Sequence, residues 1–149
     1  MKKLTFIIAS LLFSTACYAQ SLNGADSTVQ NLKKYLIKNI RYPAVARENN
    51  VQGTLVLTVK INADKKIENI EFLRHLSIEL DSEVVKKVRY YNKTIALPEA
   101  KYTIGFKFFI QDDDGDNKIK PIDGKKYSNY LFDIDIVGYQ AVRKTTIVY

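Results

Sequence analysis

The chain has 149 residues, a formal net charge of +7, one His, one Cys and no Trp. This is the length of one domain, and its 46% hydrophobic and 26% charged residues are ordinary globular usage. Together these values exclude a multi-domain enzyme, wholesale disorder and an integral membrane bundle. One His and one Cys cannot build a zinc cluster or a disulfide framework within one chain, so binding roles are favoured over enzymatic ones.

The first segment has the parts of a secretory signal peptide. Two lysines precede an uncharged stretch over residues 4–19, which ends in small residues and is shorter than the roughly 20 residues that span a bilayer. We expect cleavage after Ala19, which makes residues 1–19 a signal peptide and the mature protein periplasmic. The alternatives are an inner-membrane anchor and a lipoprotein modified at Cys17. Cleavage would remove the only thiol, which suits an oxidising compartment, and no concentrated basic stripe remains for a nucleic-acid partner.

The mature chain is expected to open with an amphipathic helix. Residues 20–27 are polar and contain a Gly, so we expect a flexible lead there. Ser27 followed by Gln30 fits a capping box, and Pro43 disfavours helix at the residue before it, so the pattern predicts a helix from Ser27 to about Arg41. Apolar residues recur along it at helical spacing: Val29, Leu32, Leu36 and Ile40.

Three strands and a second helix follow. Alternating apolar residues predict strands over residues 54–61 and 67–73, which pair antiparallel through a turn at residues 62–65. Helical spacing, with acidic residues in the first turn, predicts a helix over residues 80–91. Residues 102–110 form the clearest strand of the chain, because Ile and Phe side chains alternate along it. The pattern therefore predicts an α+β fold, with two helices packed on a small antiparallel sheet.

The C-terminal part extends this sheet. Residues 112–129 are polar and rich in Asp, and we expect an acidic loop there. Residues 130–137 alternate as a strand does, Gly138 marks a break, and residues 141–149 are again β-prone, so we predict a final β-hairpin. If residues 130–137 pair with the third strand, they close its edge, which is a common defence against aggregation.

The order of elements from the first helix to the third strand resembles the C-terminal domain of TonB, the periplasmic energy transducer of Gram-negative bacteria. The resemblance rests on a helix followed by Tyr-Pro, a Gly that opens a strand, a Leu-Asp pair that opens a helix, and a Pro before the third strand. These anchors are Tyr42, Pro43, Ala46, Gly53, Leu80, Asp81, Pro98, Phe106 and Phe108. We assign residues 28–111 to this domain and residues 112–149 to the acidic loop and the C-terminal β extension. Lys65 or Lys66 stands where the family usually has a Gly in the first hairpin turn.

The resemblance implies a protein-binding module without enzymatic activity, cofactor or small-molecule substrate. In proteins of this kind the third strand lies at the sheet edge and can accept an extended peptide through main-chain hydrogen bonds. Here the implied contact residues are Tyr102, Thr103, Ile104, Phe106 and Phe108. The implied partner is a TonB-dependent outer-membrane receptor or another envelope protein, and a homodimer through the exposed edge is a further option. The alternative is a structural accessory protein of the cell envelope with closed sheet edges.

Two further features suggest chemistry of their own. Asp residues fall at positions 1, 3, 5 and 12 of a calcium-loop spacing, at Asp112, Asp114, Asp116 and Asp123, so a calcium-stabilised secreted domain is an alternative. The sharp turn of such a loop needs a Gly where Asn117 stands, and we favour a solvated acidic turn with no metal. His75 is the only histidine, and no nucleophile, base and oxyanion donor can be assembled around it by spacing, so we expect no enzyme.

Overall fold

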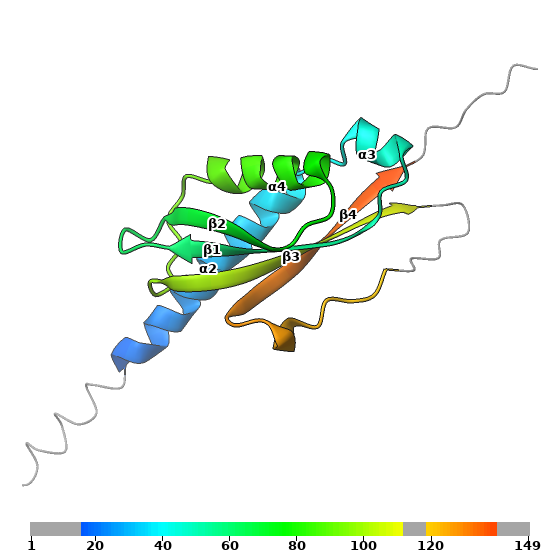
Figure 1. The fold of residues 1–149 in the computed structure, drawn as a ribbon. Coiled ribbons are helices and arrows are strands. Elements are labelled where there is room, and N and C mark those ends of the chain that lie inside the picture. The colour runs from blue at the N-terminus through cyan, green and yellow to red at the C-terminus, as the bar shows by residue number, and fades with distance from the viewer. Residues whose placement is uncertain (1–15, 112–118, 140–149) are drawn as a thin grey trace, which may run out of the picture.

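The computed structural model describes residues 16–111 and 119–139, with side chains from residue 26 onward (Figure 1). Two helices, two strands, a third helix and a third strand follow one another along the described part of the chain, and a long connector leads to the last strand. The elements are α2 (Ala16–Asn39), α3 (Ala44–Glu48), β1 (Gly53–Ile61), β2 (Ile67–Arg74), α4 (Ile78–Tyr90), β3 (Ala100–Gln111), the 3₁₀ turn η1 (Gly124–Lys126) and β4 (Tyr130–Tyr139).

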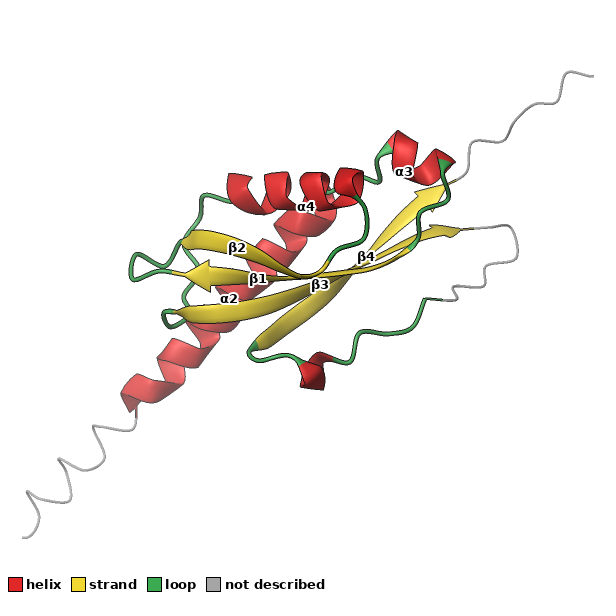
Figure 2. Cartoon of the chain, in the orientation of Figure 1, coloured by secondary structure: helices red, strands yellow, loops and turns green. Residues whose placement is uncertain are grey.

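The strands form one mixed sheet in the order β2-β1-β3-β4. β1 pairs antiparallel with both β2 and β3, whereas β4 runs parallel to β3. In Figure 2, α2 crosses behind the strands. Residues of α2 and α4 share one hydrophobic cluster with the strands, so both helices cover the same face of the sheet. The prediction of an α+β fold with helices packed on a small sheet is confirmed.

The core follows the predicted alternation. On β1, Leu55, Leu57, Val59 and Ile61 are fully buried, and the apolar positions of the other elements meet them. The buried partners are Leu32, Leu36 and Ile40 of α2, Leu80, Val84 and Val88 of α4, Ile104, Phe106 and Phe108 of β3, and Phe132, Ile134 and Ile136 of β4. Because β4 contributes as many buried side chains as α4, it is part of the domain core.

The first helix begins earlier than predicted. Residues 20–27 lie inside α2, so the expected flexible lead is wrong, and Ser27 is an interior helical residue instead of a cap. The segment from residue 16 to 27 contains no Pro and no β-branched residue. Once the buried stripe fixes the helix, each further residue adds one hydrogen bond at little entropic cost, so the helix continues toward the N-terminus.

The direction of the last strand is a second correction. The sheet is mixed and not wholly antiparallel as predicted, because β4 pairs parallel with β3 in the register Ile104↔Phe132, Phe106↔Ile134 and Phe108↔Ile136. Parallel strands need a crossover of about a dozen residues or more, and the connector over residues 112–129 is long enough to supply it. The other half of the predicted hairpin, residues 141–149, lies outside the described residues.

Candidate binding surface at the edges of the sheet

β3 has a neighbouring strand on each side, which removes the predicted peptide-accepting edge. Residues 53–61 of β1 pair with one side of it and residues 130–139 of β4 with the other. The five predicted contact residues are all buried: Tyr102, Thr103, Ile104, Phe106 and Phe108. An added strand therefore cannot pair with β3 while β4 is in place, and of the two alternatives that the sequence left open for this edge, the structure has the closed one.

Thr103 has a structural role at this junction. Its hydroxyl donates a 3.0 Å hydrogen bond to the backbone oxygen of Ser128, and its N–H donates to the backbone oxygen of Asn129 at 3.0 Å. Asn129 has a φ of 47°, so the chain turns sharply just before β4 begins. Thr103 thus fixes the point where β4 joins β3.

Most of the residues that carried the family resemblance are structural as well. The Tyr42 hydroxyl donates to the backbone oxygen of Val51, and its ring meets Phe108 edge-on with centroids 5.5 Å apart. Burial raises the pKa of Tyr42. The same ring lies over Gly138 of β4, where a Cβ would approach its Cδ2 atom to 2.8 Å. Tyr42 therefore clamps the far end of β4 to the domain.

The other anchors fix the ends of elements. Pro43 precedes α3, and Ala46 is buried within it. Gly53 has a φ of 149°, which favours glycine, and a Cβ there would meet Leu76 at 2.8 Å.

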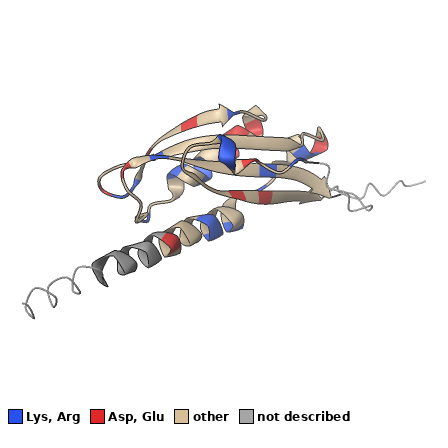
Figure 3. Cartoon of the chain, turned by 90° about the horizontal axis from the view of Figure 1, so that it is seen from below, with Lys and Arg blue, Asp and Glu red and all other residues tan. Residues whose placement is uncertain are grey.

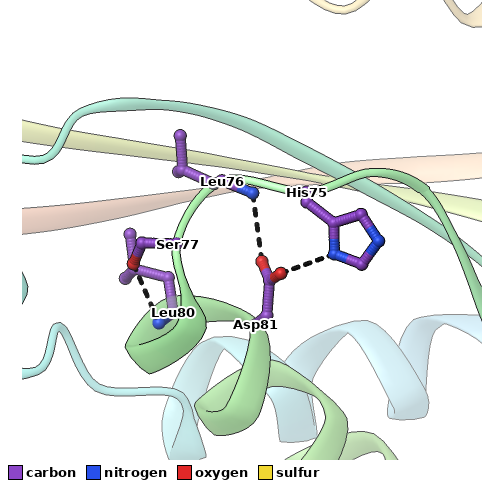
Figure 4. A network of polar contacts seen from close by, with 5 residues as sticks. All are labelled: His75, Leu76, Ser77, Leu80 and Asp81. Atoms are coloured by element: carbon purple, nitrogen blue, oxygen red, sulfur yellow. Dashed lines mark hydrogen bonds and ion pairs between the residues drawn. The ribbon is translucent and has the colours of Figure 1, made fainter.

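A network of polar contacts positions the start of α4 (Figure 4). One Asp81 oxygen accepts the Leu76 N–H at 3.1 Å, and the other lies 2.7 Å from Nδ1 of His75. The Ser77 hydroxyl accepts the Leu80 N–H at 3.3 Å as the N-cap of the helix. The His75 side chain is 68% exposed. The arrangement orients a helix terminus, and it gives the His75 ring a hydrogen-bonding partner.

Ion pairs between strands lie on the face of the sheet without helices. Figure 3 shows basic and acidic positions on the strands of the sheet. Lys60 of β1 lies 2.6 Å from Glu68 of β2, and Lys101 of β3 lies 2.7 Å from Glu71 of β2. These pairs bridge β2 to the middle of the sheet. Exposed pairs of this kind contribute little stability, so they mark the β2 side of this face as solvated.

A tighter cluster joins β3 to β4 on the same face. The Lys107 ammonium lies 2.8 Å from Asp133 and 2.7 Å from Asp135. Burial alone would lower the pKa of Lys107, but its hydrogen bonds to the two carboxylates outweigh burial and raise it. The hydrogen bond from Lys107 likewise lowers the pKa of Asp133. Two carboxylates share one ammonium, so the cluster carries a net negative charge.

A groove runs along the outer edge of β4, where α2 approaches it. Its volume is about 450 Å³, and it is lined by Lys33 and Ile37 of α2 and by Lys107, Asp133, Ile134 and Asp135 of the sheet. The Lys33 ammonium lies 5.5 Å from the centre of the Phe132 ring. Sequence reasoning did not identify this groove. One signal was present in the chain: Ile37 is an apolar residue off the buried stripe of the first helix.

The acidic residues proposed for calcium are only partly described. Asp112, Asp114 and Asp116 lie outside the described residues. The Asp123 carboxylate accepts the Lys125 N–H at 3.2 Å and caps η1. Within the ranges that the structure describes, no group of three or more His, Cys, Asp or Glu side chains is arranged to hold a metal ion.

The chain matches one family model, described as the Gram-negative bacterial TonB protein C-terminal, over residues 38–108. No curated protein and no solved structure matches the chain. The family comprises periplasmic energy-transducer and protein-interaction domains, and it is not a family of enzymes. Among the described helices, none combines the length and apolar character needed to cross a bilayer. The predicted resemblance is thus confirmed: residues 38–108 of this chain match the model of the TonB C-terminal family.

Proposed function

We propose that the chain is a periplasmic protein-binding module that contacts an outer-membrane receptor or another envelope protein by β-strand addition. The observation that carries the proposal is that a domain matching a protein-interaction family has a sheet that ends in the long strand β4. On the outer side of β4 no described strand is paired. In strand addition, main-chain hydrogen bonds supply affinity and alternate side chains supply selectivity. Because β3 is enclosed, the accepting strand is β2 or β4.

Processing of the N-terminus is part of the same proposal. Cleavage after Ala19 would leave a mature chain that begins inside α2, with residues 28–111 as the family domain and residues 112–149 as its extension. Mass spectrometry of the protein isolated from a Gram-negative periplasm tests this directly. A mass that starts at Gln20 is expected, and a retained N-terminus or a lipid at Cys17 would contradict it.

Site-specific photo-crosslinking in intact cells tests the contact. A crosslinking residue at position 135 on β4 or at position 68 on β2 should capture an outer-membrane receptor, or another envelope protein, identified by mass spectrometry. A residue at the interior position 104 serves as the control and should capture none. Failure at both edges would contradict a contact by strand addition.

One observation favours a second function, that of a structural accessory protein. β4 covers the edge of β3 that the family resemblance assigns to the peptide, and closed edges suit a protein that does not accept a strand. The crosslinking experiment separates the two readings, because an accessory protein would give no capture that depends on an edge strand.

A further inference from the structure

We infer that the outer edge of β4, together with the facing turn of α2, is the strand-accepting site, and that it takes an extended peptide whose side chains alternate between cationic and apolar. The inference rests on the proposed function, because it names the edge and the chemistry of the partner. It follows from the regularity of β4, the lining of the adjacent groove and the charge of the Lys107 cluster.

The two edge strands are not equally suited to accept a partner. β4 has ten residues and pairs with β3 with a single irregularity, between Thr103 and Ile104. β2 has eight residues, and its register with β1 shifts near both ends. A long and regular edge presents an unbroken row of backbone donors and acceptors, whereas an irregular and highly charged edge resists pairing.

The groove provides places for alternate side chains of an added strand. On the helix side, Ile37 is 53% exposed and lies with Ile134 along the groove. An exposed isoleucine on a helix beside a free strand edge favours an apolar side chain from the partner. Successive side chains of a strand point to opposite faces, so the next residue of the partner would point to the face without helices.

On that face the partner would meet Asp133 and Asp135. Their shared counterion is Lys107, and the Lys33 ammonium of α2 also acts on Asp133, so the Asp135 carboxylate is the less compensated of the two. The Asp135 side chain is 52% exposed, so a cation from the partner can reach it. Charge complementarity at such a position selects a lysine or arginine and disfavours an acidic residue.

The same charges argue against a second copy of the chain as the occupant. An antiparallel pairing of β4 with β4 around its middle would set Asp133 and Asp135 of one copy beside Asp133 and Asp135 of the other. Like charges opposite one another in a sheet are destabilising, and each cluster already carries a net negative charge. A heterologous strand with cationic residues avoids this repulsion.

The first test measures the binding of synthetic peptides to the full chain by fluorescence polarisation. The probe is a labelled peptide of about ten residues, the length of a strand, that alternates lysine with valine. We expect it to bind about tenfold more tightly than the same peptide with glutamate for lysine, because two charge contacts change sign. A copy with alternate backbone amides N-methylated cannot complete a strand ladder and should lose binding.

Matched variants locate the contact. Asp135→Asn on β4 and Glu68→Gln on β2 remove carboxylates that are 52% and 48% exposed, and each carboxylate is paired with one lysine. Asp135→Asn and Ile37→Ser should each weaken the lysine peptide about threefold or more, and Glu68→Gln should not. An equal effect of Asp135→Asn and Glu68→Gln, or binding of the N-methylated copy, would show non-specific attraction and overturn the inference.

Deuterium exchange with the bound peptide gives an independent readout. New protection of amides over residues 131–137 supports the site, and new protection confined to β2 overturns it. Two other results would also overturn the inference, because they would assign the edge to the chain itself. One is peptide binding that occurs only after residues 140–149 are deleted. The other is self-association that Asp135→Asn strengthens. If the peptide pairs with β4 but no envelope protein is crosslinked in cells, the site stands and the proposed function fails.

Discussion

The two edge strands of the sheet differ in burial, and the more buried strand is the one that lies outside the family match. β2 lies inside residues 38–108, yet none of its residues is fully buried. β4 lies outside the match, and Phe132, Ile134 and Ile136 are all buried in the common core. The family match therefore ends within the hydrophobic core and not at its boundary. The strand beyond the match completes the domain, while the strand within it is the looser edge.

The same substitution on the two edges gives the largest expected difference. Ile134→Ala should lower the free energy of unfolding by about 2–5 kcal/mol, because it opens a cavity in the core. Ile70→Ala on β2 should cost clearly less, since Ile70 is only half buried. Urea denaturation of both variants measures the contrast. Equal losses would contradict the conclusion that β4 is the more integral strand.

The clamp between Tyr42 and Gly138 allows a test of how β4 is held. Gly138→Ala would place a Cβ 2.8 Å from the Tyr42 ring, and we expect it to cost about 1–3 kcal/mol through overpacking. In a Tyr42→Ala background the added methyl has room, so the two changes together should cost less than their sum. A thermal-unfolding cycle measures this coupling, and simple additivity would show that the ring does not hold the strand.

Much of this architecture is readable from the sequence because it depends on local patterns. The strand alternation correctly predicted the buried residues of β1, β3 and β4, and the stripe of the first helix predicted Leu32, Leu36 and Ile40. Val29 of that stripe, and Ile70 and Phe72 of β2, are only partly buried. The sequence offered Lys65 or Lys66 for the hairpin position that usually holds Gly, and Lys65, with a φ of 61°, has the left-handed backbone that favours Gly. The direction of β4 was not predictable, because it depends on where the connector over residues 112–129 returns the chain.

The candidate site was harder to predict for the same reason. Lys107 meets Asp133 and Asp135 only through the parallel register of β3 and β4. Ile37 joins them only because α2 lies against β4. The alternation of Asp133 and Asp135 with buried residues was visible in the sequence, but nothing local showed that their face would meet a lysine. A site whose side chains meet through strand register and helix packing is therefore visible in the structure but not in the sequence pattern.

The ion pairs of the two edges should respond differently to acid. The pKa of Asp133 is lowered in the folded state, chiefly by its hydrogen bond to Lys107, so its stabilising contribution is present above the unfolded pKa of about 3.9 and is lost as the pH falls through the folded value. Lys107→Met should cost about 1 kcal/mol at pH 7 and flatten this acid dependence. Lys60→Met on the β2 side is the control and should change stability less. Urea denaturation at pH 7 and pH 3 measures both, and an unchanged acid slope in Lys107→Met would contradict the assignment.

The smallest effect at neutral pH is expected at Tyr130, at the start of β4. Burial raises the pKa of Tyr130 to about 12, and within the described part of the chain its buried hydroxyl has no hydrogen-bond partner. Removing an unsatisfied hydroxyl costs little, so Tyr130→Phe should leave stability at pH 7 within about 1 kcal/mol.

The raised pKa means that the neutral phenol favours folding below pH 10 and that this advantage is lost as the pH rises from about 10 to 12. Tyr130→Phe should therefore unfold less readily than the parent chain at pH 11, as measured by circular dichroism. Tyr139→Phe at the exposed end of the same strand is the control, because Tyr139 is 64% exposed. If both variants gain the same stability at pH 11, the loss of stability at alkaline pH does not arise from the buried Tyr130 hydroxyl at the start of β4.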